Sequence, residues 1–149
     1  MRILISLSAL TLTGALVAQV ANYEAVASTK QIMLDMAIPA SNALFDAGSK
    51  EKPTDADWAD FRKHALVLAE AGNLLAVPGR IATGKTLVKT KAKSAANPAG
   101  WNAAAKLMRD AGKAALVAID KKDIDLLGDD VGGKILESCA ACHDKYMIK

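Results

Sequence analysis

The sequence has few aromatic residues. Its 149 residues include two each of tryptophan, tyrosine and phenylalanine, so aromatic residues make up only 4% of the chain. Alanine is abundant instead; it is the best helix former, although its small side chain fills a core poorly. A core built mainly from alanine needs close contacts between helices or a large buried cofactor. The composition therefore favours a helical protein that holds a ligand.

The sequence also lacks a hydrophobic run long enough to cross a membrane comfortably. Arg2 precedes an apolar run that extends to Ala18 and is followed by small residues. A spanning helix needs ~20 apolar residues, so this segment is typical of a secretory signal peptide rather than of an uncleaved membrane anchor. We expect residues 1–21 to be the signal peptide, with cleavage sites between residues 18 and 27 as alternatives. Residues 22–149 are then expected to form one domain.

The chain has little excess charge. Its formal net charge of +3 falls to +2 when residues 1–21 are removed, because that segment contains Arg2 and no acidic residue. So small a charge argues against nucleic acid as a partner. The segment from Arg80 to Lys93 holds five basic residues and no acidic one, which is typical of a solvated loop.

A first amphipathic helix is expected from about Ser28 to Ala47, with Gly48 as its stop. Pro39 lies inside this pattern and should kink the helix or interrupt it locally. The inward positions, spaced by three and four residues, would be Met33, Met36, Ala40, Ala43 and Ala47.

Three further helices follow, separated by connections rich in glycine, proline and lysine. They are expected to begin at Thr54 or Asp55, after Asn97 with Pro98 in the first turn, and near Asp123. Their apolar stripes are Trp58, Phe61, Ala65, Leu68, Gly72 and Leu75; Trp101, Ala104, Met108, Ala111, Ala115 and Ala118; and Ile124, Leu127, Val131, Ile135, Cys139, Cys142 and Tyr146. Four such helices predict an all-α, antiparallel four-helix bundle.

The only two cysteines lie in the segment Cys139-Ala140-Ala141-Cys142-His143. The pattern C-x-x-C-H is the attachment pattern of c-type haem. Positions i, i+3 and i+4 share one face of a helix, so both thiols can bond to the vinyl groups of one haem while the imidazole ligates its iron. We therefore predict one covalently bound haem c, attached through Cys139 and Cys142 and ligated by His143.

Other uses of the two cysteines fit the pattern less well. A redox-active C-x-x-C pair is expected at a helix N-terminus after a strand, whereas this pair lies near the end of the last helix. A zinc site needs four ligands, and the adjacent Cys142 and His143 suit a tetrahedral site poorly even if His64 is included. A plain disulfide would leave His143 without a role.

The segment from Cys139 to Tyr146, C-x-x-C-H-x-x-Y, resembles the end of the class II c-type cytochromes, the cytochrome c prime family. The segment Lys30–Ser41 resembles the first helix of its low-spin, methionine-ligated branch, and Gly72–Leu75 and Val77–Arg80 fit the same group. The resemblance covers the mature chain and is specific at the haem motif. It implies a haem lodged within the bundle, and it leaves open a homodimer, which members of this class often form.

The resemblance also implies that a sixth iron ligand, when present, comes from the first helix. Met33 matches that position best, and Met36 is the alternative because the two are i, i+3 neighbours. Both methionines could instead be core side chains, which leaves the iron without a sixth ligand. His64 falls beside the apolar stripe of its helix and is expected at the surface or its boundary.

One motif is rejected. Residues 79–86 satisfy the nucleotide-binding pattern G-x-x-x-x-G-K-[ST], but that pattern needs a strand before it and a parallel sheet around it. Pro78 precedes the first glycine, and the rest of the chain is predicted to be helical. We expect no nucleotide partner.

These features predict a periplasmic mono-haem cytochrome that is not an enzyme and that exchanges single electrons with redox partner proteins. Ligation by methionine and histidine raises the haem potential and keeps the iron six-coordinate, and the basic segment 80–93 could steer an acidic partner. The alternative is a five-coordinate, cytochrome-c-prime-like haem protein that binds nitric oxide or carbon monoxide. A helical binding module without haem would require the C-x-x-C-H pattern to be accidental.

Overall fold

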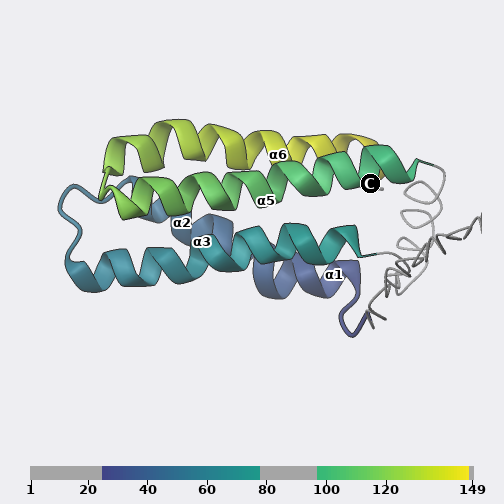
Figure 1. Cartoon of the computed structure of the whole chain (residues 1–149), viewed down its shortest axis with the longest axis horizontal. Coiled ribbons are helices and arrows are strands. Elements are labelled where there is room, and N and C mark those ends of the chain that lie inside the picture. Colours follow the sequence, from purple (N-terminus) through teal and green to yellow (C-terminus); the bar gives the residue numbers. More distant parts are fainter. Residues whose placement is uncertain (1–24, 78–96, 148–149) are drawn as a thin grey trace, which may run out of the picture.

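The computed structural model describes residues 25–77 and 97–147, and these residues form helices and connections with no strand among them. Four helical segments pack together (Figure 1), which confirms the prediction of an all-helical protein with four helices. The predicted signal peptide at residues 1–21, the basic segment 80–93 and the nucleotide-like pattern at 79–86 lie outside the described residues. None of the described helices combines the length and the apolar character needed to span a membrane.

The first helical segment is continuous but not regular. It consists of α1 (Thr29–Ile32), the π-helical turn η1 (Met33–Ala37) and α2 (Ile38–Gly48). Ser28 caps it: its side chain accepts a hydrogen bond from the N–H of Gln31, whose own side chain accepts one from the N–H of Ser28. An interruption does occur near Pro39: the π turn ends at Ala37, two residues before the proline.

The buried side chains of this segment differ from the predicted stripe. They are Ile32, Ala37, Ala40, Leu44 and Ala47, with Ser41 also buried. Met33, Met36 and Ala43 are half-buried rather than buried. The predicted stripe used regular three- and four-residue spacing throughout, and the π turn departs from that spacing.

The second segment, α3 (Asp55–Ala76), matches its prediction closely. Thr54 is the N-cap and forms a capping box with Asp57, so two of the free N–H groups at the helix start are satisfied. All six residues of the predicted stripe are buried, as the 3-4 spacing requires. Val77 leaves the helical conformation and ends the segment.

The third segment, α5 (Pro98–Asp120), begins as predicted with Asn97 as its N-cap and Pro98 in its first turn. It lies against α3 at very short range. A Cβ atom added to Gly72 would stand 2.5 Å from the backbone N of Arg109, and one added to Gly112 would stand 2.5 Å from the backbone N of Ala69. Glycine and alanine therefore permit the close helix contact that the composition indicated.

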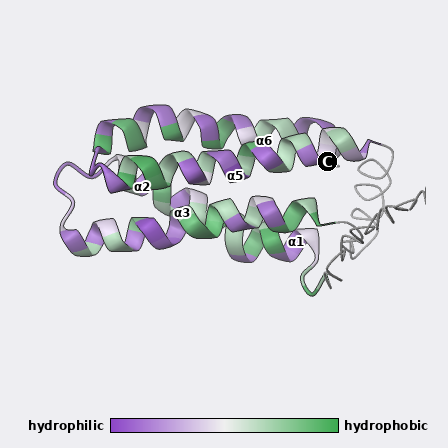
Figure 2. Cartoon of the chain, in the orientation of Figure 1, coloured by the Kyte–Doolittle hydropathy of each residue, from purple (hydrophilic) through white to green (hydrophobic). Residues whose placement is uncertain are grey.

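The last segment comprises a helical turn at residues 124–125, the π-helical η2 (Leu126–Val131) and α6 (Gly132–Tyr146). Gly128 in η2 meets Gly48 at the end of α2, because a Cβ on Gly48 would stand 2.6 Å from the Cα of Gly128. This contact ties the first segment to the last. The apolar residues of all four segments recur along helices that also carry hydrophilic residues (Figure 2), and they meet in one hydrophobic core.

Candidate functional site

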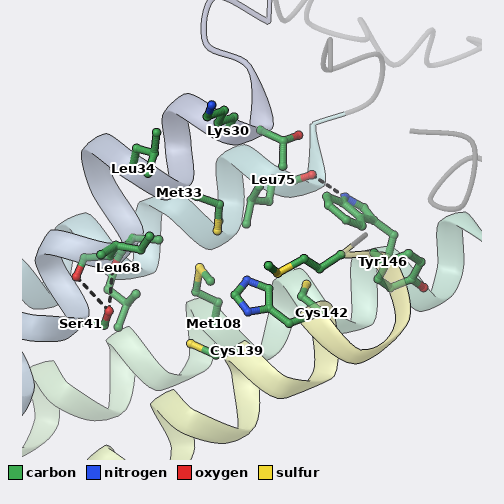
Figure 3. A pocket seen from close by; sticks show the side chains of 16 residues that line it. Lys30, Met33, Leu34, Ser41, Leu68, Leu75, Met108, Cys139, Cys142 and Tyr146 are labelled. Carbon is green, nitrogen blue, oxygen red and sulfur yellow. Dashed lines mark hydrogen bonds between the residues drawn. The ribbon is translucent and has the colours of Figure 1, made fainter. Parts of the chain in front are cut away.

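A cavity of about 330 Å³ lies between the first helical segment and α6, with walls completed by α3 and α5. Its volume falls within the range of small-molecule and cofactor sites. Most of its lining is apolar, and exposed residues such as Lys30, Leu34 and Met147 form its rim. Met33, Cys139, Cys142 and His143 all line it, as do Ala37, Ile38, Ser41, Leu68, Leu75, Trp101, Met108 and Tyr146. Figure 3 shows the cavity from close by.

The three residues of the C-x-x-C-H motif are placed by α6. Cys139, Cys142 and His143 follow one another at i, i+3 and i+4, so they share the helix face that borders the cavity. Both cysteines are half-buried and carry free thiols, whereas His143 is largely exposed and contributes to the lining. The sequence prediction that these three side chains converge on one site agrees with this placement.

The environment of the two thiols keeps them protonated. Burial raises the pKa of Cys142 to about 11, and the neighbouring Cys139 adds to the shift. Burial also raises the pKa of Cys139, although a hydrogen bond with Ser138 opposes the effect. A redox-active cysteine pair needs a lowered thiol pKa, because the thiolate is the nucleophile. The raised pKa values of Cys139 and Cys142 are opposite in direction to that requirement.

Met33 and Met36 occupy different environments. Met33 lines the cavity, and its thioether extends into it in Figure 3. Met36 packs against the hydrophobic core but does not line the cavity. Of the two methionines that the sequence analysis considered, only Met33 lies on the same cavity as Cys139, Cys142 and His143.

Met108 on α5 is a cavity residue that the sequence analysis treated only as part of the apolar stripe. Its side chain is almost completely buried, and its thioether points into the cavity in Figure 3. The sequence did contain a signal that Met108 could line a cavity. It lies among alanines on an inward stripe, where a long, flexible side chain must fill a space that alanine leaves.

An aromatic pair forms the end of the cavity nearest the C-terminus. Trp101 and Tyr146 meet edge to face with ring centroids 5.2 Å apart, and the Trp101 indole N–H donates a hydrogen bond of 2.8 Å to the carbonyl of Leu75. The Tyr146 hydroxyl is buried and has no hydrogen-bond partner among the described residues. These contacts join α3, α5 and α6 beside the C-x-x-C-H motif.

His64 does not contribute to the cavity. Its Nε2 lies 3.4 Å from a carboxylate oxygen of Asp60 on the surface of α3, in agreement with the predicted boundary position. Within residues 25–77 and 97–147, no three histidine, cysteine, aspartate or glutamate side chains gather into a group that could hold a metal ion. The four candidate zinc ligands are therefore not brought together.

The chain was also compared with known proteins at three levels. No model of a protein family, no curated protein and no solved structure among those compared matches it. The functional assignment therefore depends on the motif and on the cavity that surrounds it.

Proposed function

We propose that the chain is an exported, mono-haem class II c-type cytochrome that carries single electrons between periplasmic redox partners. Cys139 and Cys142 would hold the haem covalently, and His143 and Met33 would ligate its iron. The single observation that carries this proposal is the shared cavity, which unites the C-x-x-C-H residues of α6 with a methionine from the opposite end of the sequence.

The chemistry of the cavity suits a haem. The macrocycle is flat and largely apolar, and the cavity is lined mostly by aliphatic, aromatic and sulfur-containing side chains. Each protonated thiol would add its sulfur and its hydrogen across one vinyl double bond, which forms a thioether without any oxidant or reductant. The imidazole of His143 and the thioether of Met33 are ligands that haem iron accepts.

Each residue then has a distinct part in electron transfer. The bound haem supplies the one-electron iron couple. Met33 would stabilise the ferrous state with a soft sulfur ligand, and His143 would complete the coordination. Leu68, Leu75 and Met108 would keep water away from the metal because they close the inner wall with apolar groups.

The finer architecture and the location belong to the same proposal. An antiparallel order of the four helices would bring the start of the first helix and the end of the last to one end of the molecule, which agrees with the positions of α1 and the C-terminus in Figure 1. Export through residues 1–21 would deliver the chain to the compartment where c-type haem is attached.

Covalent attachment provides the test. The chain should be produced together with a haem-attachment system, denatured, separated on a gel and stained for haem-dependent peroxidase activity. We expect a stain for the wild type and none for the Cys139→Ala, Cys142→Ala double variant. Ser138→Ala, which changes a neighbouring residue of α6, is the matched control and should keep the stain. A stain that persists in the double variant would refute covalent attachment through these cysteines.

A further inference from the structure

The first helical segment departs from a regular α-helix at the π turn η1, from Met33 to Ala37. Its buried apolar side chains are Ile32, Ala37, Ala40, Leu44 and Ala47. From Ala37 onward these residues recur at steps of three and four, as in a regular helical core stripe. Across the turn, Ile32 and Ala37 are five residues apart, and the half-buried Met33 and Met36 between them also pack against the core.

We infer that this π turn is a one-residue insertion that sets the rotational register of Met33, and the inference rests on the proposed role of Met33 as an iron ligand. An α-helix turns by about 100° per residue, and a π turn accommodates one additional residue within an otherwise α-helical segment. The extra residue allows Ile32 to stay in the core and Met33 to line the cavity. An unbroken α-helix of the same sequence would turn Met33 about 100° away from its present direction.

Local contacts hold the turn in place. The N–H of Ile38 donates to the carbonyl of Met33, five residues earlier, which is the hydrogen bond that defines a π turn. Pro39 has no N–H, and its ring disfavours the regular position of the carbonyl four residues before it. The Ser41 hydroxyl donates to the carbonyls of Ala37 at 2.8 Å and Ile38 at 3.1 Å, directly after the turn.

The proline alone does not account for this arrangement. A proline inside a helix produces a kink and a missing hydrogen bond, but it does not shift the core stripe by a whole residue. One residue of the turn, Asp35, is exposed and does not line the cavity, so it could be removed without taking away part of the cavity wall. Met33–Ala37 is thus a positioning segment, and its effect on the iron would act through the direction of Met33.

Deleting one residue inside the turn distinguishes a π turn that holds a surplus residue from a helix that is simply continuous. If the π turn holds one surplus residue, deleting Asp35 converts it to regular α-helix and leaves Met33 facing the cavity. If the helix is simply continuous, the same deletion rotates Met33 by about 100°. Asp35→Ala controls for the lost charge, and one alanine inserted after Asp35 adds a second surplus residue that the turn cannot absorb.

Two readouts apply to the full chain. In the haem-loaded protein, the spin state and the NMR signal of an iron-bound methionine methyl report ligation by Met33. In the haem-free protein, nuclear Overhauser contacts between the Met33 methyl and Leu75, which also lines the cavity, report the register directly. We expect the wild type, Asp35→Ala and the Asp35 deletion to be low-spin and to show these contacts, and the insertion to lose both.

Loss of both signals in the folded Asp35 deletion, with Asp35→Ala unchanged, would overturn the inference. Failure of the Asp35 deletion to fold, with Asp35→Ala folded, would also contradict the inference, since removing a surplus residue should preserve the helix. A wild type without a methionine-ligated haem would instead refute the proposed function, while the contacts in the haem-free chain still test the register.

Discussion

At the scale of single residues, the site depends on which of two neighbouring methionines faces the cavity. Both are half-buried and pack against the core, but only Met33 lines the cavity. The spacing alone could not separate them, because on a regular helix both lie on the predicted inward face, and the preference for Met33 came from the family resemblance. Both methionines lie in the π turn η1.

Replacing Met33 should change the haem spectrum, whereas replacing Met36 should not. Met33→Ala should convert a low-spin haem to a high-spin one, open the iron to carbon monoxide and lower the potential, because a soft ligand of the ferrous state is lost. Met36→Ala is the matched control and should keep the low-spin spectrum, at a cost of about 1–2 kcal/mol in the free energy of unfolding. Electronic spectra and a potentiometric titration measure both. A spectral change in Met36→Ala, with Met33→Ala unaffected, would move the ligand to Met36.

The buried thiols predict a pH dependence in the haem-free chain. The pKa of Cys142 is raised to about 11 by burial, so its reactive thiolate should be scarce at neutral pH. The rate of alkylation at Cys142 should therefore continue to rise well above the pH at which an ordinary cysteine reaches its plateau. The rate should be measured in the Cys139→Ala variant, which lacks the second thiol. A plateau near neutral pH would instead support a redox-active cysteine.

At the scale of helices, replacing glycine by alanine should have opposite effects on stability at a helix–helix contact and at an open position. Gly112→Ala should destabilise the protein by about 1–3 kcal/mol, because the new Cβ would stand 2.5 Å from the backbone N of Ala69 and would force α3 and α5 apart. Gly133→Ala is the matched control. Nothing described lies within 4 Å of its added Cβ, so it should stabilise α6 by about 0.5–1 kcal/mol. Urea unfolding measures both changes, and equal effects would show that the close contact is unimportant.

The capping box of α3 predicts sensitivity to acid. Hydrogen bonds from Lys50 and Thr54 hold the pKa of Asp57 well below its ordinary value of 3.8. The folded state is therefore stabilised above that value, and the contribution is lost as the pH falls below it. Asp57→Asn should make the free energy of unfolding fall less steeply between about pH 5 and about pH 3 than it does in the wild type. Glu51→Gln, in the adjacent loop, should retain the steeper fall; equal slopes for all three proteins would contradict this assignment.

Helix boundaries were largely predictable because their signals are local. Thr54 with Asp57, and Asn97 with Pro98, mark the starts of α3 and α5 by side-chain chemistry within four residues. The two π turns were not predictable in the same way. Pro39 signalled an interruption, but the shift from the predicted stripe to one that contains Ile32 and Leu44 depends on the packing of the whole segment.

At the scale of the molecule, a core rich in alanine has two consequences. Where glycine and alanine meet, as between α3 and α5, the backbones approach closely. Between the first segment and α6, by contrast, lies a largely apolar cavity. The C-x-x-C-H motif predicted three of its residues, whereas Met108 and the Trp101–Tyr146 pair required the three-dimensional arrangement. The cavity and the motif together support an electron carrier more directly than either does alone.

The absorption spectrum of the purified, haem-loaded chain in its oxidised and reduced states tests the central claim most directly. One covalently bound haem with His143 and Met33 as ligands predicts a strong Soret band and low-spin spectra in both states, with no change on addition of carbon monoxide. High-spin spectra that shift with carbon monoxide would assign the protein to the gas-binding alternative. The absence of any Soret band from a chain produced with a haem-attachment system would contradict the proposed function altogether.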